Sequence, residues 1–189
     1  EAKPEIPDRA SADAHAAALQ GLEPVVVEVA TKRQRRTPPP PFTTSTLQQE
    51  ASRKLGFSPQ RTMRVAQRLY EGVETPEGIV GLITYMRTDS VTLSSQALAE
   101  AEAVVRARFG DAYVVAGGRR YRTRSRSAQE AHEAIRPTSF ARDPDALVAH
   151  LDRDEARLYR LVWQRALASQ MAPRELETTS VDLAAGRYG

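Results

Sequence analysis

A tyrosine and an arginine two residues apart, Tyr85 and Arg87, are the residues of this sequence best suited to chemistry on a phosphate ester. A tyrosine hydroxyl can form a covalent intermediate, which divides one difficult reaction into two easier ones. The free phenol has a pKa of about 10, so attack at neutral pH needs a neighbour that favours the phenolate. A guanidinium does this, and it also neutralises charge that develops on phosphoryl oxygens.

The position of these side chains depends on a strand that we expect over residues 79–85. Ile79 to Ile83 is a short apolar run that ends next to the tyrosine. Because side chains alternate along extended backbone, Tyr85 and Arg87 should point to the same side. The alternative is a half-buried structural tyrosine with an arginine lying beside it. An isolated Tyr-x-Arg pair is more often of this second kind.

Two helices are predicted before this strand. Ser45 and Gln48 form a capping box for the first, which Gly56 ends, and Ser58 followed by Pro59 begins the second. One face of the second helix carries a mainly apolar stripe made of Thr62, Val65, Ala66, Leu69 and Tyr70. The pair resembles a helix-turn-helix unit, a pattern that is also common in helical cores. Its arginines are candidate contacts to DNA phosphates: Arg61, Arg64 and Arg68.

A short helix is predicted after Ser127, ending at Pro137. Helical spacing places four polar residues on one of its faces: Gln129, His132, Glu133 and Arg136. We also expect a hairpin around Gly117-Gly118 with an arginine-rich arm, and a helix from Ser94 or Ser95 to Arg108. The longest helix should begin at Asp152 or Asp154 and reach Met171, with core or contact positions for Tyr159 and Trp163.

The ends of the chain differ from its middle. Ser11 is the expected N-cap of a short helix, and Val25 to Ala30 is a predicted strand that could pair with a second one at Thr178 to Ala184. Four consecutive prolines, Pro38 to Pro41, exclude helix and central strand and indicate a stiff connector. The predicted domains are residues 1–41 as an N-terminal strand segment with a Pro-rich linker, 42–172 as a helix-rich tyrosine domain, and 173–189 as a returning strand. The expected fold class is mainly α: a helical bundle with a few short strands, and parts of an adjoining β domain at the chain ends.

Composition excludes several classes of protein. The chain has 189 residues, no cysteine and a formal net charge of +3, so disulfide frameworks and thiolate zinc sites are ruled out within it. No apolar run approaches the length of a membrane span, and the start lacks a secretory pattern. We therefore expect no membrane partner and a cytoplasmic location. Because the sequence begins with Glu and ends in mid-pattern, we interpret it as a piece of a longer protein.

Three ordered blocks connect the sequence to a known family: TSTLQQEASRKLGFS at 44–58, ITYMRTDS at 83–90 and AQEAHEAIRPT at 128–138. Together they resemble the bacterial topoisomerase I branch of the type IA DNA topoisomerases, over residues 41 to 171. The Tyr-Met-Arg and Glu-Ala-Ile-Arg strings favour this branch over topoisomerase III, which resembles Y-P-R and H-H-A-I. The flanks match the family only weakly.

The resemblance implies an activity. In this family the matching tyrosine cleaves one DNA strand through a 5′-phosphotyrosyl intermediate and reseals it, which relaxes negatively supercoiled DNA. Carried over, Tyr85 is the nucleophile, Arg87 stabilises the phosphate, and His132 supports the active site. Gln129 and Arg136 are weaker candidates for contact with single-stranded DNA.

The resemblance also implies that part of the enzyme is elsewhere. The family binds Mg²⁺ through acidic residues of a separate Toprim domain, whose pattern this sequence lacks. Asp152-Arg153-Asp154 has the letters of a D-x-D motif, but we interpret it as a helix cap. No metal or cofactor is therefore expected within these residues, and the isolated chain is expected to be inactive without the remaining domains. Two further hypotheses stay open: a non-enzymatic DNA-binding module that uses the helix pair and the arginine-rich hairpin, and an interaction domain with solvated basic loops.

Overall fold

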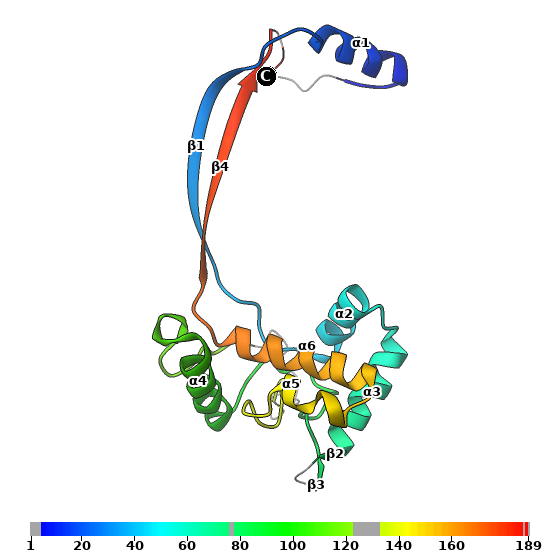
Figure 1. Ribbon diagram of the computed structural model, residues 1–189, viewed down its shortest axis with the longest axis vertical. Helices are drawn as coiled ribbons and strands as arrows, with labels where there is room; N and C mark the ends of the chain where they lie inside the picture. The colour runs from blue at the N-terminus through cyan, green and yellow to red at the C-terminus, as the bar shows by residue number, and fades with distance from the viewer. Residues whose placement is uncertain (1–4, 76–77, 123–132, 187, 189) are drawn as a thin grey trace. The chain divides into compact units, whose positions relative to one another are not determined.

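The computed structural model describes residues 5–75, 78–122, 133–186 and 188. Contacts within the chain separate two units (Figure 1). Unit 1 combines both ends of the chain, Glu1–Arg36 and Glu175–Gly189, and unit 2 is Thr37–Arg174. In the described residues the fold is mainly α with small two-stranded sheets, which confirms the predicted fold class. The assignment of the ends to a neighbouring β domain remains a prediction.

Unit 1 consists of α1 (Arg9–Leu19) and a sheet in which β1 (Val25–Arg36) pairs with β4 (Arg174–Ala184) (Figure 1). The expected pairing of the two terminal strands is confirmed, although both are longer than predicted. Side-chain contacts run from Thr31–Thr179 to Arg33–Glu177, so the strands are antiparallel. The N-cap of α1 is Asp8 and not Ser11, because the Asp8 carboxylate accepts a hydrogen bond from the Ser11 amide at 2.8 Å.

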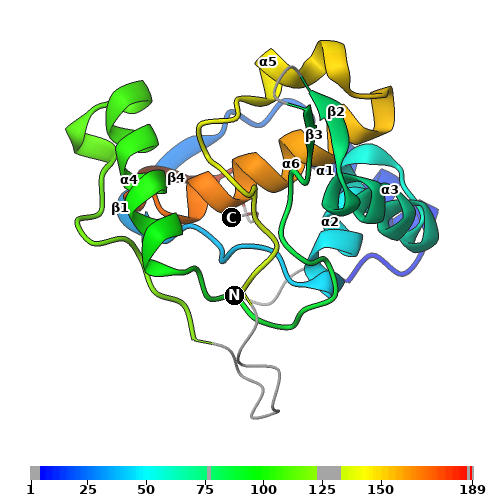
Figure 2. The ribbon, with the colours of Figure 1, turned by 90° about the horizontal axis from the view of Figure 1, so that it is seen from below.

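Unit 2 contains the helices and short strands that surround the core: α2 (Thr44–Leu55), α3 (Pro59–Glu71), β2 (Val73–Thr75), β3 (Gly78–Val80), α4 (Ser95–Phe109), η1 (Asp111–Tyr113), α5 (Pro144–Leu147), η3 (Val148–His150) and α6 (Arg153–Ser169). Helix α6 packs against α2, α3 and α5. Figure 2 shows it crossing the middle of the unit.

Local capping chemistry determines where most of these helices begin. Ser58 caps α3 as predicted, and of the two alternatives predicted for each of the other helices, Ser94 caps α4 and Asp152 caps α6. For α2 the prediction is wrong by two residues. Thr43 and Thr46 form the capping box in place of Ser45 and Gln48. Gly56 ends α2 with a φ of 70°, a left-handed conformation that favours glycine.

Two aromatic side chains of α6 anchor the core, as predicted. Tyr159 is completely buried, and its hydroxyl donates to the Arg142 carbonyl at 2.7 Å. The buried Trp163 donates its ring N–H to the Phe140 carbonyl at 3.0 Å. Each polar atom therefore has a partner, which removes the cost of burying it. Burial also raises the pKa of the Tyr159 phenol, so this tyrosine stays neutral.

The predicted strand over residues 79–85 is wrong in length, because β3 ends at Val80. The Leu82 amide then donates to a carbonyl of α3, and Ile83 forms an isolated antiparallel bridge with Pro137. The backbone thus changes hydrogen-bond partner every one or two residues. No continuous ladder forms, and Tyr85 lies beyond the last bridge.

Two other local predictions are wrong in the described residues. The segment around Gly117-Gly118 is a tight turn, and Val114 bridges to Met171 and not to residues 119–122; the rest of the predicted arginine-rich arm, 123–126, lies outside the described residues. The helix predicted to end at Pro137 is extended backbone from 133 onward, where Ile135 bridges to Phe42. Long-range partners override the local pattern in both cases. The earlier part of that helix lies outside the described residues.

The buried Tyr159 hydroxyl gives a test of this core. Tyr159→Phe leaves the Arg142 carbonyl without its donor, so the free energy of unfolding should fall by about 1–2 kcal/mol. Urea unfolding measures this change. Tyr113→Phe is the matched control, because that tyrosine is half exposed and its substitution should change stability by less than about 0.5 kcal/mol. Equal effects of the two substitutions would contradict the role of the buried hydrogen bond.

Candidate active-site segment

Burial alternates along the segment that carries the predicted nucleophile. Tyr85, Arg87 and Asp89 are exposed, and the residues between and after them are buried: Met86, Thr88 and Ser90. This period of two places the phenol and the guanidinium on the same, solvent side, although the segment is not a strand. Neither Arg87 nor Asp89 has a hydrogen bond or ion pair within the described part of the chain. Within that part of the chain, no ion pair neutralises the Arg87 charge.

Thr44, the first residue of α2, anchors the part of this segment that follows Tyr85. Its amide donates to the Thr88 carbonyl at 2.9 Å. Its hydroxyl lies 2.8 Å from the Met86 carbonyl oxygen and 3.1 Å from that of Thr88, and it accepts from the Thr88 amide at 2.9 Å. One threonine thus satisfies backbone groups on both sides of Arg87.

Thr84 anchors the part of the segment that precedes Tyr85 in the same way. Its amide donates to the Arg136 carbonyl at 2.9 Å, and its hydroxyl donates to the Ala134 carbonyl at 2.7 Å. The Arg136 amide donates back to that hydroxyl at 3.0 Å. Tyr85 therefore lies between two anchored residues. Thr84 directly precedes it, and Met86, whose carbonyl contacts Thr44, directly follows it. The Tyr85 backbone has little freedom to move.

The end of α3 approaches the same segment closely. The Leu82 amide donates to the Leu69 carbonyl at 2.7 Å, and a Cβ at Gly81 would lie 2.7 Å from the Tyr70 carbonyl oxygen. Only glycine permits that approach without a shift. The Tyr70 ring contacts the Tyr85 ring with centroids 5.4 Å apart at an interplanar angle of 65°, an edge-to-face geometry.

Arg136 is brought next to the segment by its backbone, but its side chain is largely buried. The guanidinium donates to the Glu133 carboxylate at 2.6 Å and to the Pro137 carbonyl at 2.8 Å, and the side chain is 12% exposed. The other Glu133 oxygen accepts from the Ser94 amide at 2.5 Å, at the start of α4. Burial raises the pKa of Glu133, but the hydrogen bonds from Arg136 and Ser94 outweigh it, and the pKa lies below its ordinary value of 4.5.

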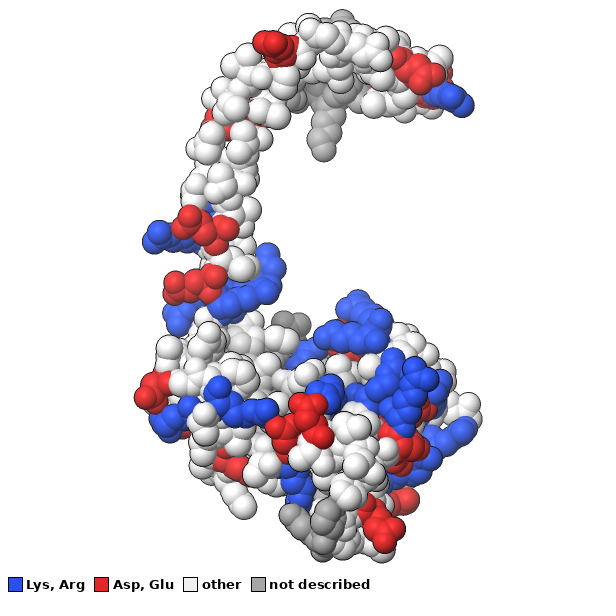
Figure 3. Space-filling view, viewed as in Figure 1, with Lys and Arg blue, Asp and Glu red and all other residues white. Residues whose placement is uncertain are grey.

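The arginines predicted to contact phosphates on α3 differ from one another. Arg61 makes a bidentate pair with Asp154, with N–O distances of 2.8 and 2.9 Å. Arg68 pairs with Asp152 and Glu155 at 2.7 and 3.0 Å. Arg64 is exposed and has no ion pair among the described residues. Figure 3 shows basic side chains gathered over α2 and α3, with acidic side chains among them.

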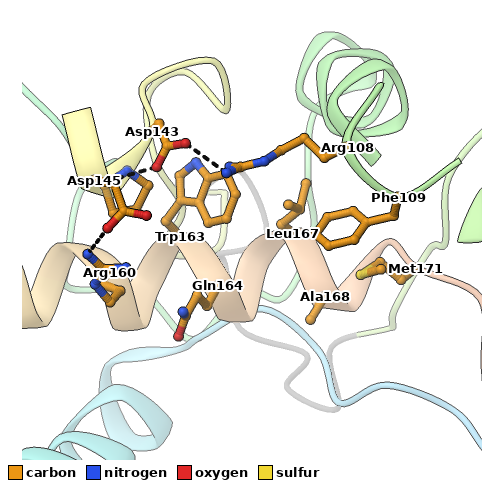
Figure 4. Close-up of a pocket in the computed structure, with 11 residues that line it drawn as sticks. Arg108, Phe109, Asp143, Asp145, Arg160, Trp163, Gln164, Leu167, Ala168 and Met171 are labelled. Atoms are coloured by element: carbon orange, nitrogen blue, oxygen red, sulfur yellow. Dashed lines mark hydrogen bonds and ion pairs between the residues drawn. The ribbon is translucent and has the colours of Figure 1, made fainter. Parts of the chain in front are cut away.

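A separate pocket of about 330 Å³ lies between the end of α4, the start of α5 and one face of α6 (Figure 4). Its floor is apolar, with Trp163 and Leu167, and its rim carries two ion pairs, Arg108–Asp143 and Arg160–Asp145. No residue of the Tyr85 segment lines it.

Comparison with known proteins identifies the family. The model of the DNA topoisomerase family matches residues 1–188. The chain belongs to the DNA topoisomerase family.

Individual relatives agree with this assignment. The DNA topoisomerase 1 of Xylella fastidiosa is 52% identical over 162 residues, which cover 85% of this chain and 20% of the relative. That of Campylobacter jejuni is 48% identical over 156 residues, 82% of this chain and 22% of the relative. The structure of full-length topoisomerase I from Thermotoga maritima has a TM-score of 0.78 and 42% identity, covering 94% of this chain and 28% of that one. The topoisomerase chain thus spans about a fifth of the length of the curated relatives.

The family resemblance implies an Mg²⁺ site, and acidic side chains occur in the described part of the topoisomerase chain. No three His, Cys, Asp or Glu side chains gather there as a metal-binding group. The Asp152 and Asp154 carboxylates are occupied by arginines of α3, and Asp152 caps α6 as predicted. No membrane-crossing helix occurs among the described residues either. Gln129 and His132 lie outside the described residues, so their predicted roles stay predictions.

Sequence reasoning missed the residues that hold the segment. Thr44 directly precedes the predicted capping residue Ser45, and Thr84 lies within the predicted strand; neither received a role of its own. Tyr70 was assigned to the apolar face of α3, yet its side chain is half exposed and contacts Tyr85. Gly81 carries a weak signal, because a glycine inside an apolar run often marks close backbone approach.

The Thr44 contacts can be tested by substitution. Thr44→Val keeps the shape of the side chain and removes the hydroxyl, which leaves the Thr88 amide without its acceptor. We expect a loss of about 1–3 kcal/mol in the free energy of unfolding and faster hydrogen exchange at residues 86–88. Thr44→Ser retains the hydroxyl and should restore protection. Unchanged exchange in the valine variant would show that other contacts hold the segment.

The lowered pKa of Glu133 predicts a pH dependence. A carboxyl whose pKa is depressed by folding contributes stability above its unfolded value, and loses it as pH falls through the folded value. The stability difference between the natural chain and Glu133→Gln should therefore be full at pH 7 and shrink below pH 4.5, the ordinary value. Urea unfolding at several pH values measures it. Glu74→Gln, at an exposed residue of β2, controls for removal of a carboxyl in general. A pH-independent difference would contradict the Glu133–Arg136 contact as its source.

Proposed function

We propose that this chain supplies the nucleophile of a type IA DNA topoisomerase, which cleaves and reseals one strand of DNA. The observation that supports this most directly is the anchored segment. Tyr85 is 42% exposed, Arg87 beside it has no partner within the described residues, and hydrogen bonds fix the backbone on both sides of the pair. An exposed phenol and a guanidinium that has no partner among the described residues, both on one side of the segment, are consistent with the chemistry expected of the family.

The reaction conserves bonds. The Tyr85 Oη attacks the phosphorus of a single-stranded phosphodiester, the bond from phosphorus to the 3′ oxygen breaks, and the tyrosine becomes joined to the 5′-phosphate. The phenol loses its proton and the leaving 3′ oxygen gains one. The 3′-hydroxyl then attacks the same phosphorus to reverse both steps. One phosphodiester is exchanged for another, so resealing requires no external energy source.

Arg87 stabilises the negative charge that develops during this exchange. Its guanidinium stabilises the phenolate before attack and the phosphoryl oxygens during it. The planar fork of arginine also matches two phosphate oxygens better than a lysine would. His132 remains a proposed supporting residue. Gln129, Arg136 and the α3 arginines remain proposed DNA contacts, of which Arg64 is the one exposed without an ion pair in the described part of the chain.

The chain is proposed to act together with further domains of the same enzyme. It spans about a fifth of the length of its curated relatives, and no group of three or more His, Cys, Asp or Glu side chains that could hold a metal occurs among the described residues. A separate domain would hold Mg²⁺, which would supply positive charge at the phosphate. The proposed substrate, a single-stranded segment of negatively supercoiled DNA in the bacterial chromosome, places the enzyme in the cytoplasm. No observation favours the alternative of a non-enzymatic DNA-binding module.

Covalent trapping tests this function in the complete enzyme that we propose carries the chain. Single-stranded DNA labelled at its 3′ end is incubated with enzyme and Mg²⁺, then denatured. Because the tyrosine takes the 5′-phosphate of the downstream fragment, 3′ label should stay with the protein, and 5′ label should be released. Tyr85→Phe should abolish trapping and leave DNA affinity within about twofold.

The neighbouring tyrosine provides a matched control. Tyr70 is 41% exposed and contacts Tyr85, so Tyr70→Phe removes an equivalent hydroxyl from the same surface. It should trap DNA normally. Trapping that survives Tyr85→Phe, or that disappears in Tyr70→Phe alone, would refute the assignment of the nucleophile. Normal DNA binding without trapping by the natural enzyme would favour the binding-module hypothesis.

A further inference from the structure

The ring contact between Tyr70 and Tyr85 connects helix α3 with the segment that carries the proposed nucleophile. Tyr70 is in the last turn of α3, and Tyr85 lies on the anchored segment. Their centroids are 5.4 Å apart at 65°, within the range of favourable edge-to-face pairs. Both side chains are about two-fifths exposed, so the contact lies at the surface of the protein.

The backbone determines this contact. The Leu82 amide is bonded to the Leu69 carbonyl, one residue before Tyr70. Gly81 comes so close to the Tyr70 carbonyl oxygen that a Cβ there would lie at 2.7 Å. Thr44 and Thr84 then restrict the backbone around Tyr85. The two rings therefore meet because their backbones are held, and the contact exists before any substrate arrives.

A tyrosine nucleophile needs more than a fixed backbone. Its oxygen lies at the far end of a side chain with two rotatable bonds, so small rotations move it out of line with the phosphorus. An exposed ring loses rotamer freedom when it is oriented, and a displacement of about 1 Å can cost up to a hundredfold in rate. A neighbouring ring that touches one edge favours a subset of these rotations before substrate binds.

We propose that Tyr70 is a positioning residue, whose ring orients the Tyr85 phenol for attack on the phosphodiester. This inference rests on the proposed role of Tyr85 as nucleophile. The ring of Tyr70 carries the function and its hydroxyl does not, because the observed contact is between the rings. Tyr70 acts on the rate of cleavage and resealing, and it leaves DNA affinity unchanged.

Substitutions at Tyr70 in the complete enzyme distinguish the role of the ring from that of the hydroxyl, and an effect on cleavage rate from an effect on DNA affinity. Tyr70→Phe keeps the ring, and Tyr70→Leu removes it but keeps apolar bulk. Single-turnover cleavage of a short single-stranded oligonucleotide gives the rate, and fluorescence anisotropy of the same oligonucleotide gives the affinity. The expected result is a rate about 2- to 10-fold lower in the leucine variant, the loss that corresponds to one aromatic pair. The phenylalanine variant should cleave at the natural rate, and both should bind normally.

Tyr113→Leu is the matched control. Tyr113 is also half exposed and also contacts another ring, that of Phe109, at 6.1 Å. Its loss should not change the cleavage rate. Thermal unfolding of all variants, with Tyr70→Met as a second ring-free variant, identifies effects that come from misfolding.

Three results would overturn the proposal. A natural rate in well-folded Tyr70→Leu and Tyr70→Met would show that the ring does not orient Tyr85. An equal loss in Tyr70→Phe would assign the effect to the hydroxyl. A loss of affinity equal to the loss of rate would make Tyr70 a DNA contact. The trapping experiment with Tyr85→Phe is independent of these, so a failure of the nucleophile assignment is recognised separately.

Discussion

The structure around Tyr85 depends on how backbone groups find partners where no sheet continues. After β3 ends, the chain makes single hydrogen bonds to α3, to the extended segment 134–138 and to the start of α2. Each buried N–H or C=O left unpaired would cost about 1–3 kcal/mol, so these bonds fix the path of the chain. They also require α2, α3 and residues 134–138 to be in place together. The site therefore depends on three separate parts of unit 2.

The alternation of buried and exposed side chains also holds this segment in place. Met86 and Thr88 face the interior, and Tyr85 and Arg87 face outward between and beside them. Burial of the first pair holds the second pair at the surface. Arg61 and Arg68 illustrate the opposite use of the same residue type, because they pair with acids at the start of α6 and bind α3 to it. Arg87, in contrast, has no ion pair among the described residues.

What could be predicted from the sequence is what local chemistry determines. Ser58, Ser94 and Asp152 cap their helices because each accepts from amides two or three residues away, and the buried face of α3 follows from helical spacing. The spacing of Tyr85 and Arg87 also predicted their common side. The errors arise where distant segments compete with local patterns. Ile135 pairs with Phe42 and Val114 with Met171, and neither partner could be found from neighbouring residues.

Within the site, too, local sequence patterns did not reveal contacts between distant residues. Thr44 and Thr84 belong to residue types that are common at helix starts and in strands, and only their distant partners distinguish them. Tyr70 fits the apolar stripe of α3 by periodicity, but that stripe reaches the helix end where the core stops. Periodicity predicts the direction of a side chain, and tertiary structure decides whether protein or solvent is there.

A reversible reaction makes stronger demands on such a site than an irreversible one. If Tyr85 attacks and is later displaced from the same phosphorus, the forward and reverse steps pass through the same arrangement of atoms. The enzyme must keep that arrangement while the strand is open and the 3′-hydroxyl is not covalently attached. Hydrogen bonds from Thr44 and Thr84 to the backbone involve no substrate atoms, so cleavage does not break them. If the proposed reaction takes place, the backbone geometry needed for resealing is therefore held by the protein and not by the DNA that has just been cut.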